Sequence, residues 1–274
     1  MNKVINIEKK VNIIIAIIFI LFMVIYYIFL TVLMKNDELY FWYNDNKILF
    51  NCLNYIFIIS SLIVTERTVF KRIYKKYIDV LNNELEPEKF IKLTEMELQK
   101  TKRALYKVCL KINLAAGYSA LDKTEEALKI LEEIDFKGKK RVRPNLKILY
   151  YYNKSLFLCI LNRKDEAKEI YEDGLVILQE NKHIITMEMK IYFDILKNLI
   201  YHEDNREEII NLYERIIKIT KEKINIIFAK YNIAQYKEEM GNIKEALELY
   251  KEVAEKGNKL YITERAEEKI KKLN

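Results

Sequence analysis

The sequence predicts an all-α protein: an N-terminal transmembrane helical hairpin, then an α-solenoid of about four helix pairs with a C-terminal capping helix. Three observations support this. The 274 residues include only 5 Gly and 2 Pro, neither type occurs before Pro87, and 51% of residues are hydrophobic and 32% charged. Two long apolar runs lie near the N-terminus, and a short pattern recurs four times after residue 103. A chain with so few turn-forming residues favours helix.

The first apolar run, Val11–Met34, contains no charged residue. As a helix it would rise about 36 Å, enough to cross a hydrocarbon core of roughly 30 Å. The second run, Ile48–Val64, is shorter and sits at the lower limit for a span. A cleaved signal peptide is the alternative, but the apolar core is too long and no small-residue cleavage site follows it. We therefore expect a membrane anchor over residues 1–64, with transmembrane helices at 11–34 and 48–64.

Charged flanks predict the orientation of these spans. Basic residues precede the first span and follow the second, whereas the connecting loop 35–47 holds more acids than lysines. Positive flanks stay in the cytoplasm, so we expect a multi-pass protein of the cell membrane with its N-terminus and repeat domain cytoplasmic. The aromatic residues 40–43 suit the outer interface. Asn51, Asn54 and Ser61 share a helical face that should contact either the first span or a second copy of the chain, as in a homo-oligomer.

The sequence predicts a helical stalk or a degenerate repeat over residues 65–102. The stretch 65–85 is helical in pattern, Pro87 marks a break, and a second helix should continue to about Lys100.

The recurring pattern is a small or apolar anchor residue preceded by glutamate and followed four residues later by leucine or tyrosine. Turn-forming residues lie five positions before each anchor. The anchors are Ala127, Ala167, Ile209 and Ala246; the leucine and tyrosines are Leu131, Tyr171, Tyr213 and Tyr250; the turn residues are Asp122, Asn162, Asp204 and Gly241. Each unit is therefore expected to be helix, tight turn, helix, with the small residue allowing close approach.

This pattern resembles the tetratricopeptide repeat (TPR) over residues 103–274. The anchors are 40, 42 and 37 residues apart, longer than the usual 34, so extra turns or loops are expected between units. Ile209 replaces the small residue of the third unit, where we expect looser packing. The amphipathic segment 259–274 fits the cap that a solenoid needs.

The sequence contains no recognisable motif for catalysis or metal binding. The three cysteines, Cys52, Cys109 and Cys159, are far apart in apolar runs and are expected to be buried thiols. His202, beside two acids, is expected to be exposed. We expect no enzyme, no cofactor and no metal site.

The densest basic run, Lys137–Arg143, leaves three interpretations open: contact with nucleic acid, contact with anionic lipid headgroups, or a solvated loop. The net charge of +7 is spread among interspersed charges of both signs, so we do not expect a nucleic-acid-binding protein.

The resemblance implies a binding surface on the first helix of each unit. Asparagine recurs fourteen residues before three anchors, and the third unit has Ile195 there with Asn198 nearby. An amide both donates and accepts, so it can hold a peptide backbone without selecting side chains. Tyrosines one residue earlier would add apolar contact. The predicted protein- or peptide-binding residues are Asn113, Tyr152, Asn153, Asn198, Tyr231 and Asn232.

The sequence thus predicts a membrane-anchored scaffold that faces the cytoplasm and binds a protein or peptide through the concave face of its repeats. The alternative is a structural subunit of a membrane complex that contacts its partners through the transmembrane hairpin. An enzyme or a small-molecule sensor is the third hypothesis.

Overall fold

The computed structural model describes residues 17, 21–22, 24–29, 31–32, 35–136, 142–201 and 205–273. These residues form helices joined by turns, with no β-strand among them. The predicted all-α class is confirmed, and the arrangement is consistent with an α-solenoid-like fold. The chain divides into two compact units, Met1–Tyr77 and Ile78–Asn274. The predicted domain boundaries after residues 64 and 102 stay predictions.

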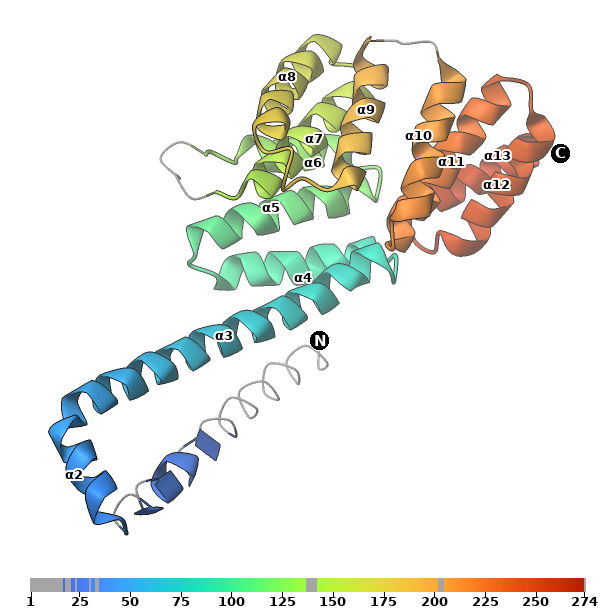
Figure 1. Ribbon diagram of the computed structural model, residues 1–274. Helices are drawn as coiled ribbons and strands as arrows, with labels where there is room; N and C mark the ends of the chain where they lie inside the picture. The colour runs from blue at the N-terminus through green and yellow to red at the C-terminus, as the bar shows by residue number, and fades with distance from the viewer. Residues whose placement is uncertain are drawn as a thin grey trace. The chain divides into compact units, whose positions relative to one another are not determined.

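The described helices are shown in Figure 1. Their bounds are α2 Asp37–Asp45, α3 Lys47–Asn82, α4 Pro87–Lys100, α5 Ala104–Ser119, α6 Thr124–Glu132, α7 Pro144–Ile160, α8 Lys164–Glu180, α9 Met187–Tyr201, α10 Arg206–Ile219, α11 Lys223–Glu239, α12 Ile243–Lys256 and α13 Tyr261–Leu273.

In the N-terminal unit, α2 forms within the segment that was expected to be a connecting loop. Helix α3 then runs without interruption for 36 residues, and its last turn belongs to the second unit. Apolar side chains near the start of α3 are exposed, among them Ile48, Leu49, Tyr55 and Ile56.

The predicted transmembrane hairpin must be corrected. Across the described residues, no helix is both long enough and apolar enough to cross a membrane. The run Ile48–Val64 would rise only about 25 Å as a helix, less than the roughly 30 Å of a hydrocarbon core, and Asn51 and Asn54 interrupt it. Much of the first predicted span, 11–34, lies outside the described residues. The orientation and localisation were inferred from these spans and stay untested.

Helix α4 begins where the sequence placed a break. Pro87 occupies the first turn of α4, where its missing N–H has no intrahelical partner to lose. Helix α4 ends at Lys100, as predicted, and packs against α5. Consecutive helices then pack as pairs, α5 with α6, α7 with α8, α9 with α10 and α11 with α12, and α13 packs on α12.

In three of the four pairs, the tight turn contains one residue in the left-handed backbone region. Asp122, Asn162 and Gly241 have φ values of 64°, 60° and 80°. Asparagine, aspartate and glycine tolerate this region best because short polar side chains, or none, reduce the steric penalty. Three of the four predicted turn residues are therefore confirmed, and the fourth, Asp204, lies outside the described residues.

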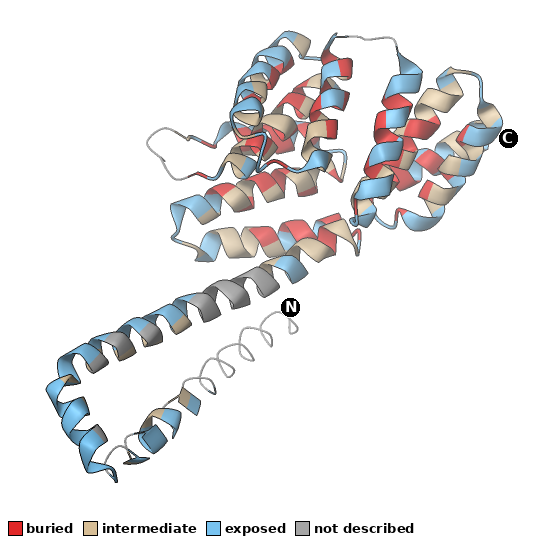
Figure 2. Ribbon diagram, in the orientation of Figure 1, coloured by how far each residue is buried: buried red, intermediate tan, exposed pale blue. Residues whose placement is uncertain are grey.

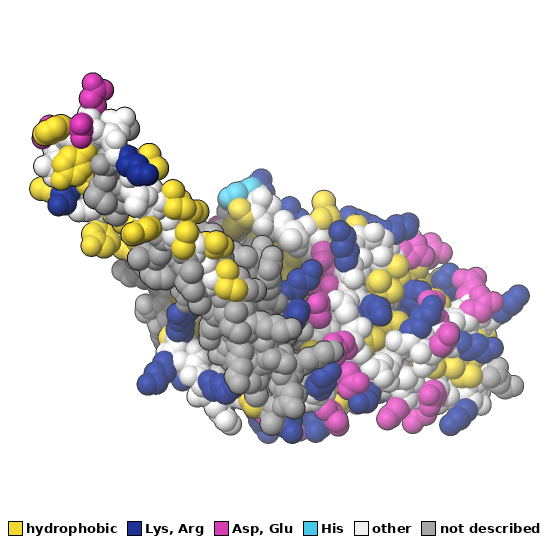
Figure 3. All heavy atoms as spheres, turned by 90° about the horizontal axis from the view of Figure 1, so that it is seen from below, with side chains coloured by type: hydrophobic (Ala, Val, Ile, Leu, Met, Phe, Trp, Pro, Cys, Tyr) yellow, Lys and Arg dark blue, Asp and Glu magenta, His cyan; other side chains and the backbone are white. Residues whose placement is uncertain are grey.

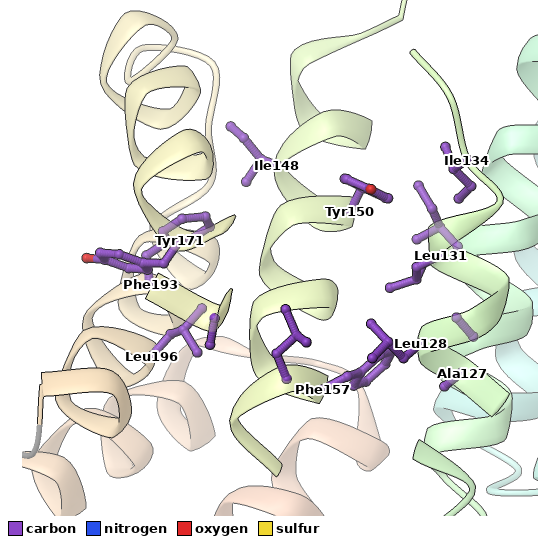
Figure 4. Close-up of a cluster of buried hydrophobic side chains, with 14 of the residues drawn as sticks. Ala127, Leu128, Leu131, Ile134, Ile148, Tyr150, Phe157, Tyr171, Phe193 and Leu196 are labelled. Atoms are coloured by element: carbon purple, nitrogen blue, oxygen red, sulfur yellow. The ribbon is translucent and has the colours of Figure 1, made fainter. Parts of the chain in front are cut away.

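The predicted anchors form the contacts between helices. Ala127, Ala167 and Ala246 are fully buried, and Ile209 is buried. The leucine and tyrosines four residues later are also buried. Figure 2 shows buried residues along the facing sides of α4 to α13, and Figure 4 shows one core cluster in which Ala127, Leu131 and Phe157 lie together. Close packing favours alanine at three of these positions, since extra methylenes in a tightly packed contact cost about 1–3 kcal/mol.

The third pair packs less extensively than the other three, as expected from Ile209. First helices of successive pairs also contact each other between α5 and α7, between α7 and α9, and between α11 and α13. Among the described helices, α9 and α11 have little or no contact of this kind. The fold is therefore loosest around the third pair.

The C-terminal end of the second unit closes back onto its beginning. Asn258 Nδ2 donates to the Glu84 carbonyl at 2.8 Å, and Lys259 Nζ lies 2.7 Å from Glu86 Oε2. Near the first tight turn, Tyr261 N donates to the Ala120 carbonyl at 3.2 Å and Arg265 pairs with Asp122 at 2.5 Å. The start of α13 thus contacts the turn between α5 and α6.

Candidate functional site

The predicted binding residues lie deeper than a surface groove requires. Three of them, Asn153, Asn198 and Tyr231, are buried. The other three, Asn113, Tyr152 and Asn232, are half-buried. Their proposed contact with a partner stays a prediction.

Neighbouring helices cover the two tyrosines among the predicted binding residues. The Tyr152 ring lies 5.3 Å from the Tyr192 ring of α9, and the Tyr231 ring lies 5.8 Å from the Tyr250 ring of α12. Burial raises the pKa values of Tyr152 and Tyr231, so both hydroxyls stay protonated at neutral pH. These tyrosines therefore contribute to packing between helix pairs.

Two of the asparagines bond to their own helices. Asn198 Nδ2 donates to the Asp194 carbonyl at 3.0 Å, and Asn232 Nδ2 donates to the Phe228 carbonyl at 2.8 Å. Each amide thus uses a donor on the carbonyl four residues earlier, a local bond that asparagine forms readily in helices. What each can offer a partner is its side-chain oxygen and its second N–H.

A pocket of about 370 Å³ opens around the loosely packed third pair. It lies near the ends of helices in three consecutive pairs, where α7, α9 and α11 finish and α8 and α10 begin. Apolar side chains form much of its wall, and charged side chains and one tyrosine complete it. The lining residues are Leu156, Cys159, Ile160, Lys164, Asn198, Leu199, Arg206, Ile209, Tyr236 and Glu239.

The pocket contains few fixed charges, and two of them are paired. Arg206 Nε lies 3.3 Å from Glu239 Oε2, with both side chains about half exposed. Burial, together with the nearby Glu239 charge, raises the pKa of Tyr236, which therefore keeps its proton. Burial also raises the pKa of the Cys159 thiol to about 11, so this cysteine is a poor nucleophile at neutral pH.

Asn198 is the one lining residue that the sequence nominated for binding. The others escaped prediction because they come from five helices, and only the fold brings them together. The signal that pointed to this region was Ile209, whose bulk marked the third pair as different. Apolar walls with a few polar groups are typical of binding pockets.

The predicted cysteine environments differ from those in the structure. Cys52 is exposed, and Cys109 and Cys159 are only partly buried, which corrects the expectation of buried thiols. The correction arises because Cys52 lies in the N-terminal unit, on an exposed face of α3. His202 and most of the basic run, residues 137–141, lie outside the described residues. Across the described part of the chain, no cluster of histidine, cysteine and acidic residues could hold a metal.

In comparisons with known proteins, neither a family model nor a curated protein sequence matches this chain. The predicted identity, a TPR protein with a two-span membrane hairpin, is therefore corrected. The helix pairs suggest such repeats only loosely, and the anchor spacings of 40, 42 and 37 residues depart from the 34 of that family. A short pattern of alanine and aromatic residues at helical spacing arises wherever two helices pack closely.

Proposed function

We propose that this chain is a scaffold or adaptor that binds a protein or peptide through its helical unit, Ile78–Asn274. The pairs α5–α6, α7–α8, α9–α10 and α11–α12 would act as successive units of a solenoid, with α13 as the cap. Stacked helix pairs offer extended surfaces on which several units contribute to one partner. In Figure 3 acidic and basic side chains alternate over much of the surface, which does not favour one strongly charged partner.

The observation that supports binding most directly is the pocket around the third pair. It joins three consecutive helix pairs, combines apolar walls with a few polar groups, and includes Asn198. Pockets of roughly 300–1,000 Å³ with this mixture are typical binding sites. The half-buried Asn113, Tyr152 and Asn232 stay candidates for additional contacts on the first helices.

Site-specific photo-crosslinking in the native cells tests the proposal. A benzophenone amino acid at Ile160, which lines the pocket and is 53% exposed, should form an adduct with a partner polypeptide. Val176 is the matched control, because it is 55% exposed on α8 and does not line the pocket. Equal adducts at both positions, or none at Ile160, would contradict binding at this pocket.

A further inference from the structure

The first half of α3 exposes apolar side chains while several of its polar side chains are partly buried. Seven large hydrophobic residues are between 44% (Ile63) and 82% (Ile48) exposed, in the part of α3 that Figure 2 shows as largely exposed. Asn51, Asn54 and Ser61 of the same stretch are half-buried. A helix that faces water normally has the opposite distribution. Exposed apolar surface of this kind marks a site that another molecule covers.

The exposed residues have the spacing of a helix that packs along another helix. Those at successive intervals of four, three, four and three residues are Ile48, Cys52, Tyr55, Ile59 and Leu62. Those in a second row beside them, at intervals of seven, are Leu49, Ile56 and Ile63. A period of 3.5 residues keeps one row of side chains aligned with a partner helix. These eight residues are called the α3 stripe below.

The exposed apolar area of the α3 stripe is comparable with what a stable dimer buries. A large side chain buries on the order of 150–250 Å² when it is fully covered, so the seven hydrophobic residues together offer roughly 600–1,000 Å². A standard interface buries about 800 Å² on each partner. The stripe alone is therefore large enough for one protein partner.

A second copy of α3 fits the stripe better than a lipid surface does. Helices that lie on membranes combine an apolar face with a polar face rich in lysine and arginine. Between residues 47 and 63, α3 has a single charged residue, Lys47. Nor does any helix among the described residues have the length and apolarity that a membrane crossing needs. A second α3 supplies the same 3.5-residue spacing, so the two rows of side chains can interdigitate.

We propose that two copies of the chain associate through their α3 stripes to form a two-fold dimer. A two-fold contact joins the same surface of both copies, so one self-complementary stripe is sufficient. Tyr55 lies near the middle of the stripe, which runs from Ile48 to Ile63. It therefore meets the same region of the second copy whether the two helices run parallel or antiparallel. This association is separate from peptide binding by the helical unit.

Cysteine crosslinking of the purified full chain tests the contact. The starting variant is Cys52→Ser, which removes the exposed thiol of α3. With Tyr55→Cys added, mild oxidation should give a disulfide-linked dimer, and mass spectrometry should place the disulfide at position 55. Ser60→Cys in the same background is the matched control, because Ser60 is exposed on α3 but does not belong to the stripe. It should give no such dimer.

A charge placed in the stripe should weaken the association. Ile59 is 56% exposed, so Ile59→Lys leaves the packing within one chain largely unchanged. In the dimer the ammonium group would lose its water, and the dissociation constant should rise by about tenfold or more. Ser60→Lys adds the same charge one residue outside the stripe and should leave that constant nearly unchanged. Sedimentation velocity over a range of protein concentrations measures both variants.

Three results would overturn the inference: a monomeric chain at every concentration, equal crosslinking at positions 55 and 60, or equal dissociation constants for Ile59→Lys and the unmodified chain. The first two need no substitution at Ile59, so they decide the matter even if that variant fails to fold. Flotation with vesicles of phosphatidylcholine and phosphatidylglycerol separates the alternative. If the chain floats with these vesicles and position 55 gives no dimer, the stripe contacts lipid and the proposed dimer is wrong.

Discussion

Replacing Gly241 by alanine should destabilise the helical unit through the backbone alone. Gly241 follows α11 with φ at +80°, and a Cβ built there would meet no atom within 4 Å. Its N–H donates to the Glu238 carbonyl at 3.0 Å, and the next N–H donates to the Lys237 carbonyl at 2.8 Å. These bonds hold the turn in the left-handed conformation, so alanine must adopt that conformation or break them.

The size of the effect follows from two opposing contributions. An L-residue in the left-handed helical region costs about 1–2 kcal/mol relative to glycine. Alanine also restricts the unfolded chain, which returns about 0.4–1 kcal/mol. The free energy of unfolding should therefore fall by about 1 kcal/mol, or about 2–4 °C in melting temperature for a domain of this size.

The matched variant is Asn162→Gly, which makes the opposite change at the equivalent turn, where φ is 60°. It should change the free energy of unfolding by less than about 1 kcal/mol, because the left-handed penalty that it relieves is small for asparagine and is opposed by the freedom that glycine adds to the unfolded chain. Urea unfolding followed by circular dichroism measures both variants. If Gly241→Ala is neutral while Asn162→Gly is destabilising, the left-handed turn does not stabilise the pairs in the way argued.

Two further predictions concern contacts between helices. Burial alone would raise the pKa of Glu238, but hydrogen bonds from Lys269 and a tyrosine outweigh it and lower the pKa. The stability that Glu238 contributes is therefore present above its unfolded pKa near 4.5 and is lost as the pH falls through the folded pKa. The variant Lys269→Met should destabilise the chain at neutral pH and progressively less in acid. Urea unfolding at a series of pH values measures this. The buried Ser155 Oγ of α7 donates to the Ala167 carbonyl of α8 at 2.7 Å. The variant Ser155→Ala should lower the free energy of unfolding by about 1 kcal/mol in the same assay. An unchanged free energy of unfolding would show that this hydrogen bond does not stabilise the pair.

The tight turns could be predicted from sequence because their requirements are local. A left-handed residue is needed at the end of a first helix, and few residue types accept it. The anchors were predictable for a similar reason, since helices that approach closely need a small side chain at the contact. Even the loose third pair followed from a single bulky residue, Ile209.

How deeply the predicted binding residues are buried could not be predicted in this way. Whether Asn153 or Tyr231 is exposed depends on which helices lie beside its own and on the closure at the C-terminal end. That closure depends on pairs such as Asn258 with Glu84 and Arg265 with Asp122, which are 174 and 143 residues apart in the sequence. No local pattern reports contacts between such distant positions. The second predicted span, 48–64, was wrong for a different reason: its apolar composition suggested a span, but its 17 residues rise only about 25 Å as a helix.

Asn198 and Asn232 show how far position in a helix determines the role of a residue. Both donate Nδ2 to the carbonyl four residues earlier, at nearly the same distance. Asn232 is half-buried, whereas Asn198 is buried and its side-chain oxygen has no hydrogen-bond partner among the described residues. The difference in burial arises from the helices around each residue and not from the local bond, which the two residues share.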